Sequence, residues 1–214
     1  MREMGVICAN NHATEQLAAR IWIEPFLDQV GEGVTLAVRR LSGPDEVSRH
    51  SVEDMIQRAF VTVYCGHATE WTVGDAMFDT EVYIDGANVL RAAGNHLWVL
   101  GCYSARHLGP LAVERGVASY VGMRATMWAE HRFLSITAPL VSESLMNLAS
   151  GMATVDVRER FVEELDRLSA RLEADGPQGA DDYAFWTTFL ALQLMSATFF
   201  IHEYQDAPAE RPTD

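Results

Sequence analysis

Short apolar segments with strand character alternate with helical segments through the first 122 residues of the chain. Strands are expected at 5–9, 34–41, 60–65, 97–100 and 118–122, and helices at 13–30, 52–58, 86–93 and 111–115. A strand, a helix and a further strand in this order form a right-handed crossover, and repeated crossovers build a parallel sheet. The sequence therefore predicts an α/β fold with a mostly parallel central sheet of about five to six strands.

The rest of the chain is predicted to be helical. Helices are expected at 133–148, with an interruption near Pro139, at 156–172 and at 183–204. The last of these is apolar on nearly every side, but polar residues interrupt it and no basic residues flank it. We therefore expect it to pack on the domain or on a partner, and not to enter a membrane. This gives a domain at 1–175, an apolar helix at 176–205 and a flexible tail at 206–214.

The charge and the cysteines exclude several classes of function. The 214 residues include 30 acidic and 16 basic side chains, and the net charge of -14 provides no basic surface for nucleic acid. The cysteines, Cys8, Cys65 and Cys102, have no metal-ligand spacing, and no glycine-rich phosphate loop is present. An odd number of cysteines without a signal peptide is typical of the reducing cytoplasm. We expect a cytoplasmic protein that holds neither a metal nor another cofactor.

Two of the predicted strands end at a glycine that is followed by a potentially reactive residue. The strand 60–65 leads into Gly66-His67, and the strand 97–100 leads into Gly101-Cys102. Because parallel strands end at the same edge of a sheet, His67 and Cys102 are predicted to lie close together. Cysteine reacts as a thiolate, and histidine is suited to accept the thiol proton near neutral pH. The backbone N–H groups of Ala68 and Cys102 are candidates for an oxyanion hole.

These segments resemble the caspase-like cysteine peptidases of clan CD, and most closely their bacterial CHAT family. The resemblance covers about residues 4–172. It lies in Tyr64-Cys65-Gly66-His67, in Val99-Leu100-Gly101-Cys102-Tyr103-Ser104 and in the helix and strand of 111–122. The family usually has glycine after the histidine, where this chain has Ala68. The resemblance implies a three-layer α/β/α sandwich that hydrolyses peptide bonds through a thioester.

The resemblance also implies roles for individual residues. His67 would be the general base and then the general acid, and Cys102 the nucleophile. The substrate would be another protein in a bacterial defence or cell-death system, and a protein partner would activate the protease. Substrate contacts are expected from residues that follow the two strand ends: Glu70, Asp75, Asp79, Tyr103 and Ser104.

Two other functions fit the same residues. The first is a flavodoxin-like amidotransferase or hydrolase, in which the histidine follows the cysteine in the chain, and its candidates are His107 and His131. The second is a catalytically silent adaptor that keeps the sheet for binding.

Overall fold

The computed structural model describes residues 2–9, 13–30, 35–43, 45–74, 81–127, 130–177 and 182–203. Six strands of this part of the chain form one sheet in the order β2-β1-β3-β4-β5-β6. The strands are β1 (Glu3–Cys8), β2 (Ala37–Ser42), β3 (Val61–Cys65), β4 (His96–Leu100), β5 (Ser119–Met123) and β6 (Phe199–Glu203). The first five are parallel and β6 runs antiparallel to β5. The predicted α/β fold with a mostly parallel sheet is therefore confirmed.

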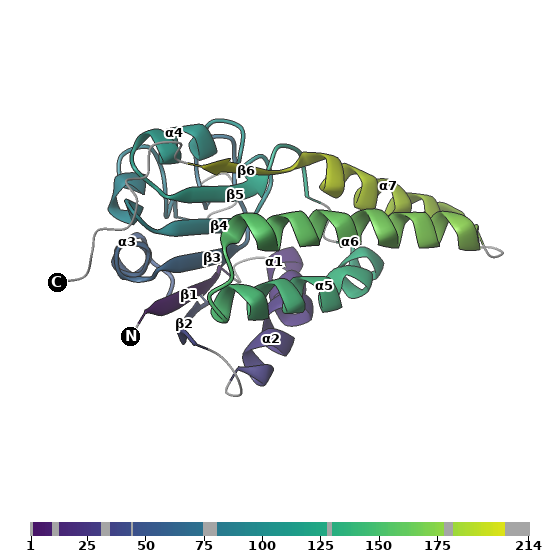
Figure 1. Ribbon diagram of the computed structural model, residues 1–214, viewed down its shortest axis with the longest axis horizontal. Helices are drawn as coiled ribbons and strands as arrows, with labels where there is room; N and C mark the ends of the chain where they lie inside the picture. The colour runs from purple at the N-terminus through teal and green to yellow at the C-terminus, as the bar shows by residue number, and fades with distance from the viewer. Residues whose placement is uncertain are drawn as a thin grey trace.

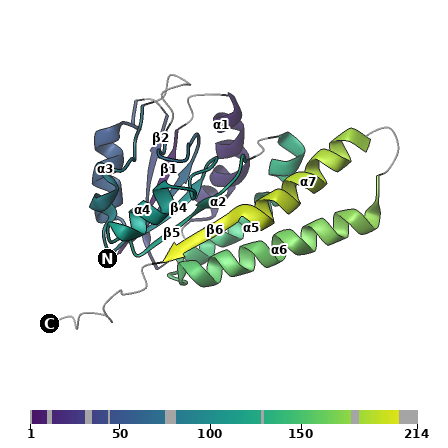
Figure 2. The same ribbon diagram turned by 90° about the horizontal axis from the view of Figure 1, so that it is seen from above.

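Helices cover both faces of this sheet. The helical segments are α1 (Ala13–Ala18), the π-helical turn η1 (Ala19–Ile23), α2 (Glu24–Gln29), α3 (Arg49–Arg58), the 3₁₀ turn η3 (Val89–Ala92), α4 (Leu108–Glu114), α5 (His131–Ala149), α6 (Thr154–Asp175) and α7 (Asp182–Thr198). Helices α3 and α4 lie on one face, and the α1–α2 run and α5 to α7 lie on the other (Figures 1 and 2). The long pair α6 and α7 reaches beyond the sheet.

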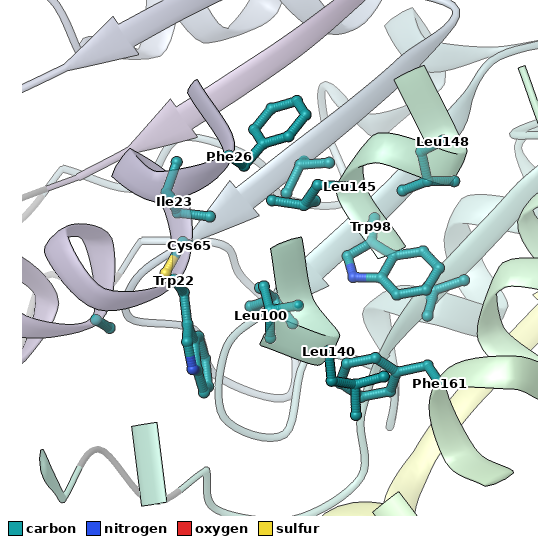
Figure 3. Packing of buried hydrophobic residues seen from close by; sticks show 14 of the residues in the cluster. Trp22, Ile23, Phe26, Cys65, Trp98, Leu100, Leu140, Leu145, Leu148 and Phe161 are labelled. Carbon is teal, nitrogen blue, oxygen red and sulfur yellow. The ribbon is translucent and has the colours of Figure 1, made fainter. Parts of the chain in front are cut away.

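Each central strand divides its side chains between two apolar cores, as the two-residue period of a strand requires. In β4, Trp98 and Leu100 face one core, and Leu97 and Val99 face the other. Figure 3 shows the first core, where Trp98 and Leu100 lie among side chains of the α1–α2 run and of α5 and α6. Burial on both faces explains why these strands are continuously apolar in sequence.

Helix α5 continues through Pro139, so the predicted interruption there is wrong. Proline removes one backbone hydrogen bond from a helix. The flanking side chains of α5, including Leu134, Leu140 and Leu145, are buried in the core. Tertiary packing of this kind supplies most of the stability of a helix and holds α5 together across the proline.

The predicted helix at 183–204 is wrong at its carboxyl end. Helix α7 ends at Thr198, and Phe199–Glu203 form β6, which pairs along β5 from Met123 to Ser119. A strand at the edge of a sheet leaves its backbone N–H and C=O groups unpaired, and β6 satisfies those of β5. The described helices include none that is long and apolar enough to cross a membrane.

Isolated bridges link residues 68, 73 and 84, which lie between β3 and η3. Ile84 forms an isolated bridge with Val73, and Val73 forms another with Ala68. These bridges fold the chain after His67 back on itself at the edge of the sheet.

Candidate functional site

The register of β3 and β4 places His67 and Cys102 at the same edge of the sheet. Cys65 of β3 is paired with Leu100 of β4. The pairing extends beyond the strands, because the Gly66 N–H donates a hydrogen bond to the Leu100 carbonyl oxygen at 3.2 Å. His67 and Cys102 each follow the register pair by two residues. The two strand ends thus bring together the residues that the sequence predicts as a pair.

Glycine is required at position 101 because the neighbouring backbone comes very close. A Cβ atom on Gly101 would lie 2.7 Å from the Ala68 Cβ and 2.9 Å from the Gly66 carbonyl oxygen. Both distances are shorter than van der Waals contact. The Ala68 methyl group is buried, with 6% of the residue exposed, and takes the space above Gly101. Glycine therefore allows the His67 and Cys102 segments to approach each other.

His67 and Cys102 line one pocket at the carboxyl edge of the sheet. Its volume is about 320 Å³. The walls come from α1, from the ends of β3 and β4, and from the segment after β5: Thr14, Glu15, Ala18, Gly66, His67, Cys102, Thr126 and Met127. A pocket with mostly apolar walls and a few polar groups is the usual form of a ligand site in an α/β protein.

The Cys102 thiol is partly buried and is held by the segment after β5. Its Sγ accepts a hydrogen bond from the Met127 N–H at 3.2 Å. Burial raises the pKa of this thiol above its ordinary value, and the Met127 hydrogen bond opposes part of the increase. Cys8 and Cys65 are fully buried, and burial raises the pKa of Cys8 to about 12 and that of Cys65 well above its usual range. Cys102 is therefore the most accessible of the three thiols.

The backbone of His67 is fixed from both sides. Its N–H donates to the Glu15 Oε1 at 2.8 Å. Its carbonyl oxygen accepts from the Tyr64 hydroxyl at 3.0 Å and from the Gly74 N–H at 2.8 Å. Burial, together with the negative charge of Glu15, raises the pKa of Tyr64 and keeps its hydroxyl a donor. These contacts define the position from which the imidazole extends.

Sequence reasoning missed Glu15. This residue lies in the first turn of α1 and only 4% of it is exposed. Its position in the sequence, shortly after β1, could have indicated it. Strand β1 pairs with β3, and both strands end at the same edge of the sheet. An acidic residue in that first turn can reach the end of the neighbouring strand.

The loop after Cys102 has a strained residue and a buried hydroxyl. Tyr103 has φ of 54°, a left-handed conformation that costs a residue with a side chain roughly 1–2 kcal/mol. Its N–H donates to the Ala125 carbonyl oxygen at 3.0 Å. Ser104 is fully buried, donates to the Gly101 carbonyl oxygen at 3.1 Å and accepts from the Met123 N–H at 3.2 Å. Ser104 thus holds the Cys102 loop from inside the protein.

Glu70 joins the His67 segment to the loop after Cys102. Its carboxylate forms an ion pair with Arg106 at 2.6 Å and lies 3.3 Å from the His107 Nε2. Its carbonyl oxygen accepts from the Leu108 N–H at 2.8 Å, and Trp71 stacks on His107 with ring centroids 4.3 Å apart. The charge of Glu70 is therefore already matched within the chain.

The other predicted candidates are placed as follows. Asp75 and Asp79 lie outside the described residues. Among the residues that the structure describes, the pocket wall includes His67 but neither His107 nor His131. His131 is the first residue of α5 and its Nδ1 lies 3.4 Å from the Ser135 hydroxyl. Within the same residues, no group of three or more His, Cys, Asp or Glu side chains is arranged to hold a metal ion.

Comparisons with known proteins find a similar solved structure but no matching family and no matching curated protein. No protein-family model matches the sequence, and no curated protein matches it. A solved structure described as the complex of the Porphyromonas gingivalis RgpB pro- and mature domains is similar, with a TM-score of 0.49 and 11% sequence identity. The similarity covers 94% of this chain and 47% of that chain, so this chain spans about half of that protein's length.

Proposed function

We propose that this protein is a cysteine endopeptidase in which His67 and Cys102 form the catalytic dyad. The observation that supports it best is that both residues follow paired strand ends by the same two positions and line one pocket. Cys102 is also the only one of the three cysteines that is not fully buried. The predicted resemblance to caspase-like peptidases of the CHAT family points to the same pair.

The proposed reaction uses the two side chains in turn. His67 accepts the Cys102 proton, and Sγ attacks the peptide carbonyl carbon, whose oxygen becomes an oxyanion. Backbone N–H groups of Ala68 and Cys102 stabilise this oxyanion. His67 then gives the proton to the departing amine, which leaves a thioester on Cys102. Water adds to the thioester carbon while His67 takes a water proton, and the acid product and free thiol are released.

An activation step is part of this proposal. Because burial raises the pKa of Cys102, its thiol is mostly protonated near neutral pH in the structure described here. A protein partner, or a movement of the segment that contains Met127, would lower that pKa and turn the protease on. The substrate is proposed to be another cytoplasmic protein of a bacterial defence or cell-death system.

Alkylation by iodoacetamide tests the dyad without a known substrate. At pH 7 we expect Cys102 to react faster than Cys8 and Cys65, and H67A to slow this reaction roughly tenfold. The exposed His50 of α3 provides the control, because H50A changes no group of the pocket. The Cys102 rate is expected to rise continuously beyond pH 9, because a thiol with a raised pKa forms its thiolate only at high pH. Intact mass and peptide mapping give the rates.

The alternatives give different results in the same experiment. Equally slow alkylation of all three cysteines would favour a silent adaptor. A loss of Cys102 reactivity in H107A or H131A, with none in H67A, would favour the flavodoxin-like hydrolase. Cleavage of peptides or of candidate proteins, with C102A as the inactive reference, then tests the peptidase reaction, and addition of candidate activating proteins tests the switch.

A further inference from the structure

The carboxylate of Glu15 is the one buried acidic group in the described wall of the pocket. Only 4% of Glu15 is exposed, and it extends from α1 toward the end of β3, 52 residues further along the chain. Burial of a carboxylate is unfavourable unless hydrogen bonds compensate for lost hydration. The hydrogen bonds that the buried Glu15 carboxylate accepts should therefore indicate its role.

The carboxylate holds the backbone of His67. Its Oε1 accepts the His67 N–H at 2.8 Å, a charge-assisted hydrogen bond of the stronger kind. The approach needs a glycine at position 66, because a Cβ there would lie 2.8 Å from that same oxygen and 2.7 Å from the Tyr64 hydroxyl. The absence of a side chain at Gly66 thus allows the Glu15 carboxylate to reach the His67 N–H.

The opposite side of His67 is fixed independently. The Tyr64 hydroxyl and the Gly74 N–H both donate to the His67 carbonyl oxygen. With the carbonyl group fixed, the bond to Glu15 sets the remaining orientation of the His67 backbone, and with it the Cα–Cβ direction from which the imidazole extends. A misplacement of a catalytic group by about 1 Å can slow a reaction by roughly 100-fold.

We propose that Glu15 is a positioning residue for His67, which it holds by accepting the His67 backbone N–H. The proposal rests on the proposed role of His67 as the base for Cys102. In this role the acceptor oxygen of residue 15 is required, and its negative charge is not. Glutamine at this position keeps an acceptor oxygen of the same reach, whereas alanine removes it.

A double-mutant cycle on the full chain tests this role. The rate of Cys102 alkylation by iodoacetamide at pH 7 is measured for the wild type, E15A, H67A and the double variant E15A/H67A. We expect E15A to slow the reaction to about the H67A rate, roughly tenfold, and to add nothing in the H67A background. We expect E15Q to stay within about threefold of the wild type. E24A is the matched control, because Glu24 lies on the same helical run outside the pocket wall.

Each result decides between the two proposals. If H67A does not slow alkylation, the dyad and the role of Glu15 are both wrong. If H67A slows alkylation but E15A slows it by the same factor in both backgrounds, the dyad stands and Glu15 is only structural. An E15Q rate as low as that of E15A also overturns the assignment. Circular dichroism shows whether E15A folds. If it does not, E15D replaces it, because the aspartate side chain is one methylene group shorter and moves the acceptor oxygen away from the His67 N–H.

Discussion

The glycines beside His67 and Cys102 make different contributions to the site. Gly66 leaves room for a side-chain oxygen from α1, whereas Gly101 leaves room for the backbone of the neighbouring segment. Ala68 occupies the remaining space above Gly101, since its Cβ lies 2.7 Å from where a Cβ on Gly101 would be. The alanine after the histidine is thus part of the packing of the two segments.

Substitution of Gly101 tests this packing. We expect G101A to destabilise the protein by about 1–3 kcal/mol, because the added methyl group has no free space. We also expect slower alkylation of Cys102. The matched control is G86A, whose added Cβ would meet only the end of the Leu111 side chain at 3.1 Å. Urea unfolding gives the stability.

Removal of the Ala68 methyl group sharpens the test. In the double variant A68G/G101A the 2.7 Å contact disappears but the 2.9 Å contact with the Gly66 carbonyl oxygen remains. We therefore expect the stability to recover only in part. Full stability in G101A alone would show that the two segments are not packed as described.

The residues of the site differ in how far the sequence could predict them. His67 and Cys102 could be found, because each follows a glycine at the end of an apolar strand. Glu15 could not be assigned a partner, since its hydrogen bond to His67 spans 52 residues and depends on the order of the strands. The burial of Ser104 could not be predicted from the sequence either, because its hydrogen-bond partner Met123 belongs to the next strand along the sheet.

At the scale of secondary-structure elements, His96 connects β4, β5 and α6. Its Nδ1 lies 2.8 Å from the Ser119 hydroxyl and 3.0 Å from the Thr154 hydroxyl, and these two hydroxyls are 2.8 Å apart. Burial lowers the pKa of His96, and the charge of Arg2 lowers it further. The folded protein therefore favours the neutral imidazole at this junction.

The lowered pKa of His96 makes stability depend on pH. In the unfolded chain a histidine binds its proton below about pH 6.5, whereas folded His96 binds it only at lower pH. Stability from this group is thus present above pH 6.5 and is lost as the pH falls through the folded pKa. We expect the loss between pH 7.5 and 5 in urea unfolding to be smaller in H96N than in the wild type. An equal loss in both proteins would contradict the assignment, and H50N is the control.

Element boundaries were predicted well where the pattern is local. Strands β1, β3, β4 and β5 follow from short apolar runs, and the stripe at 156–172 corresponds to α6. Strand β2 contains Arg39 and Arg40 and begins at residue 37, three residues after the predicted start. The change from helix α7 to strand β6 could not be predicted from the sequence, because Phe199–Glu203 continue the apolar segment with no glycine or proline to mark a turn. What decides their conformation is the open edge of β5, which is a tertiary feature.

At the scale of the whole molecule, β6 connects the carboxyl-terminal segment to the candidate site. Strand β5, with which it pairs, leads directly into the segment that contains Met127. The His202 Nε2 lies 2.9 Å from the Ala105 carbonyl oxygen, in the loop after Cys102. Arg158 of α6 donates to the Phe199 carbonyl oxygen at 2.7 Å and secures the start of the strand. The helix pair and β6 thus belong to the same folded body as the site.

Truncation tests this dependence. A chain that ends at residue 175 would lose β6 and expose the edge of β5, and buried apolar residues of α7 such as Leu192 and Met195 would be missing from the core. We expect it to aggregate, or to unfold without a cooperative transition. A chain that ends at residue 205 is the control and is expected to unfold as the full chain does. Cooperative unfolding of the 1–175 chain, with wild-type Cys102 alkylation, would contradict this description.

The pairing of β5 with β6 also has a consequence for biosynthesis. The ribosome must add roughly 75 residues after β5 before β6 exists, which takes ~4–15 s at the usual rates of translation. During that interval the parallel strands and the residues of the pocket have been made, but the sheet edge beside the Cys102 loop is unpaired. The candidate site would therefore lie beside a complete sheet only after β6 has been synthesised and has paired with β5.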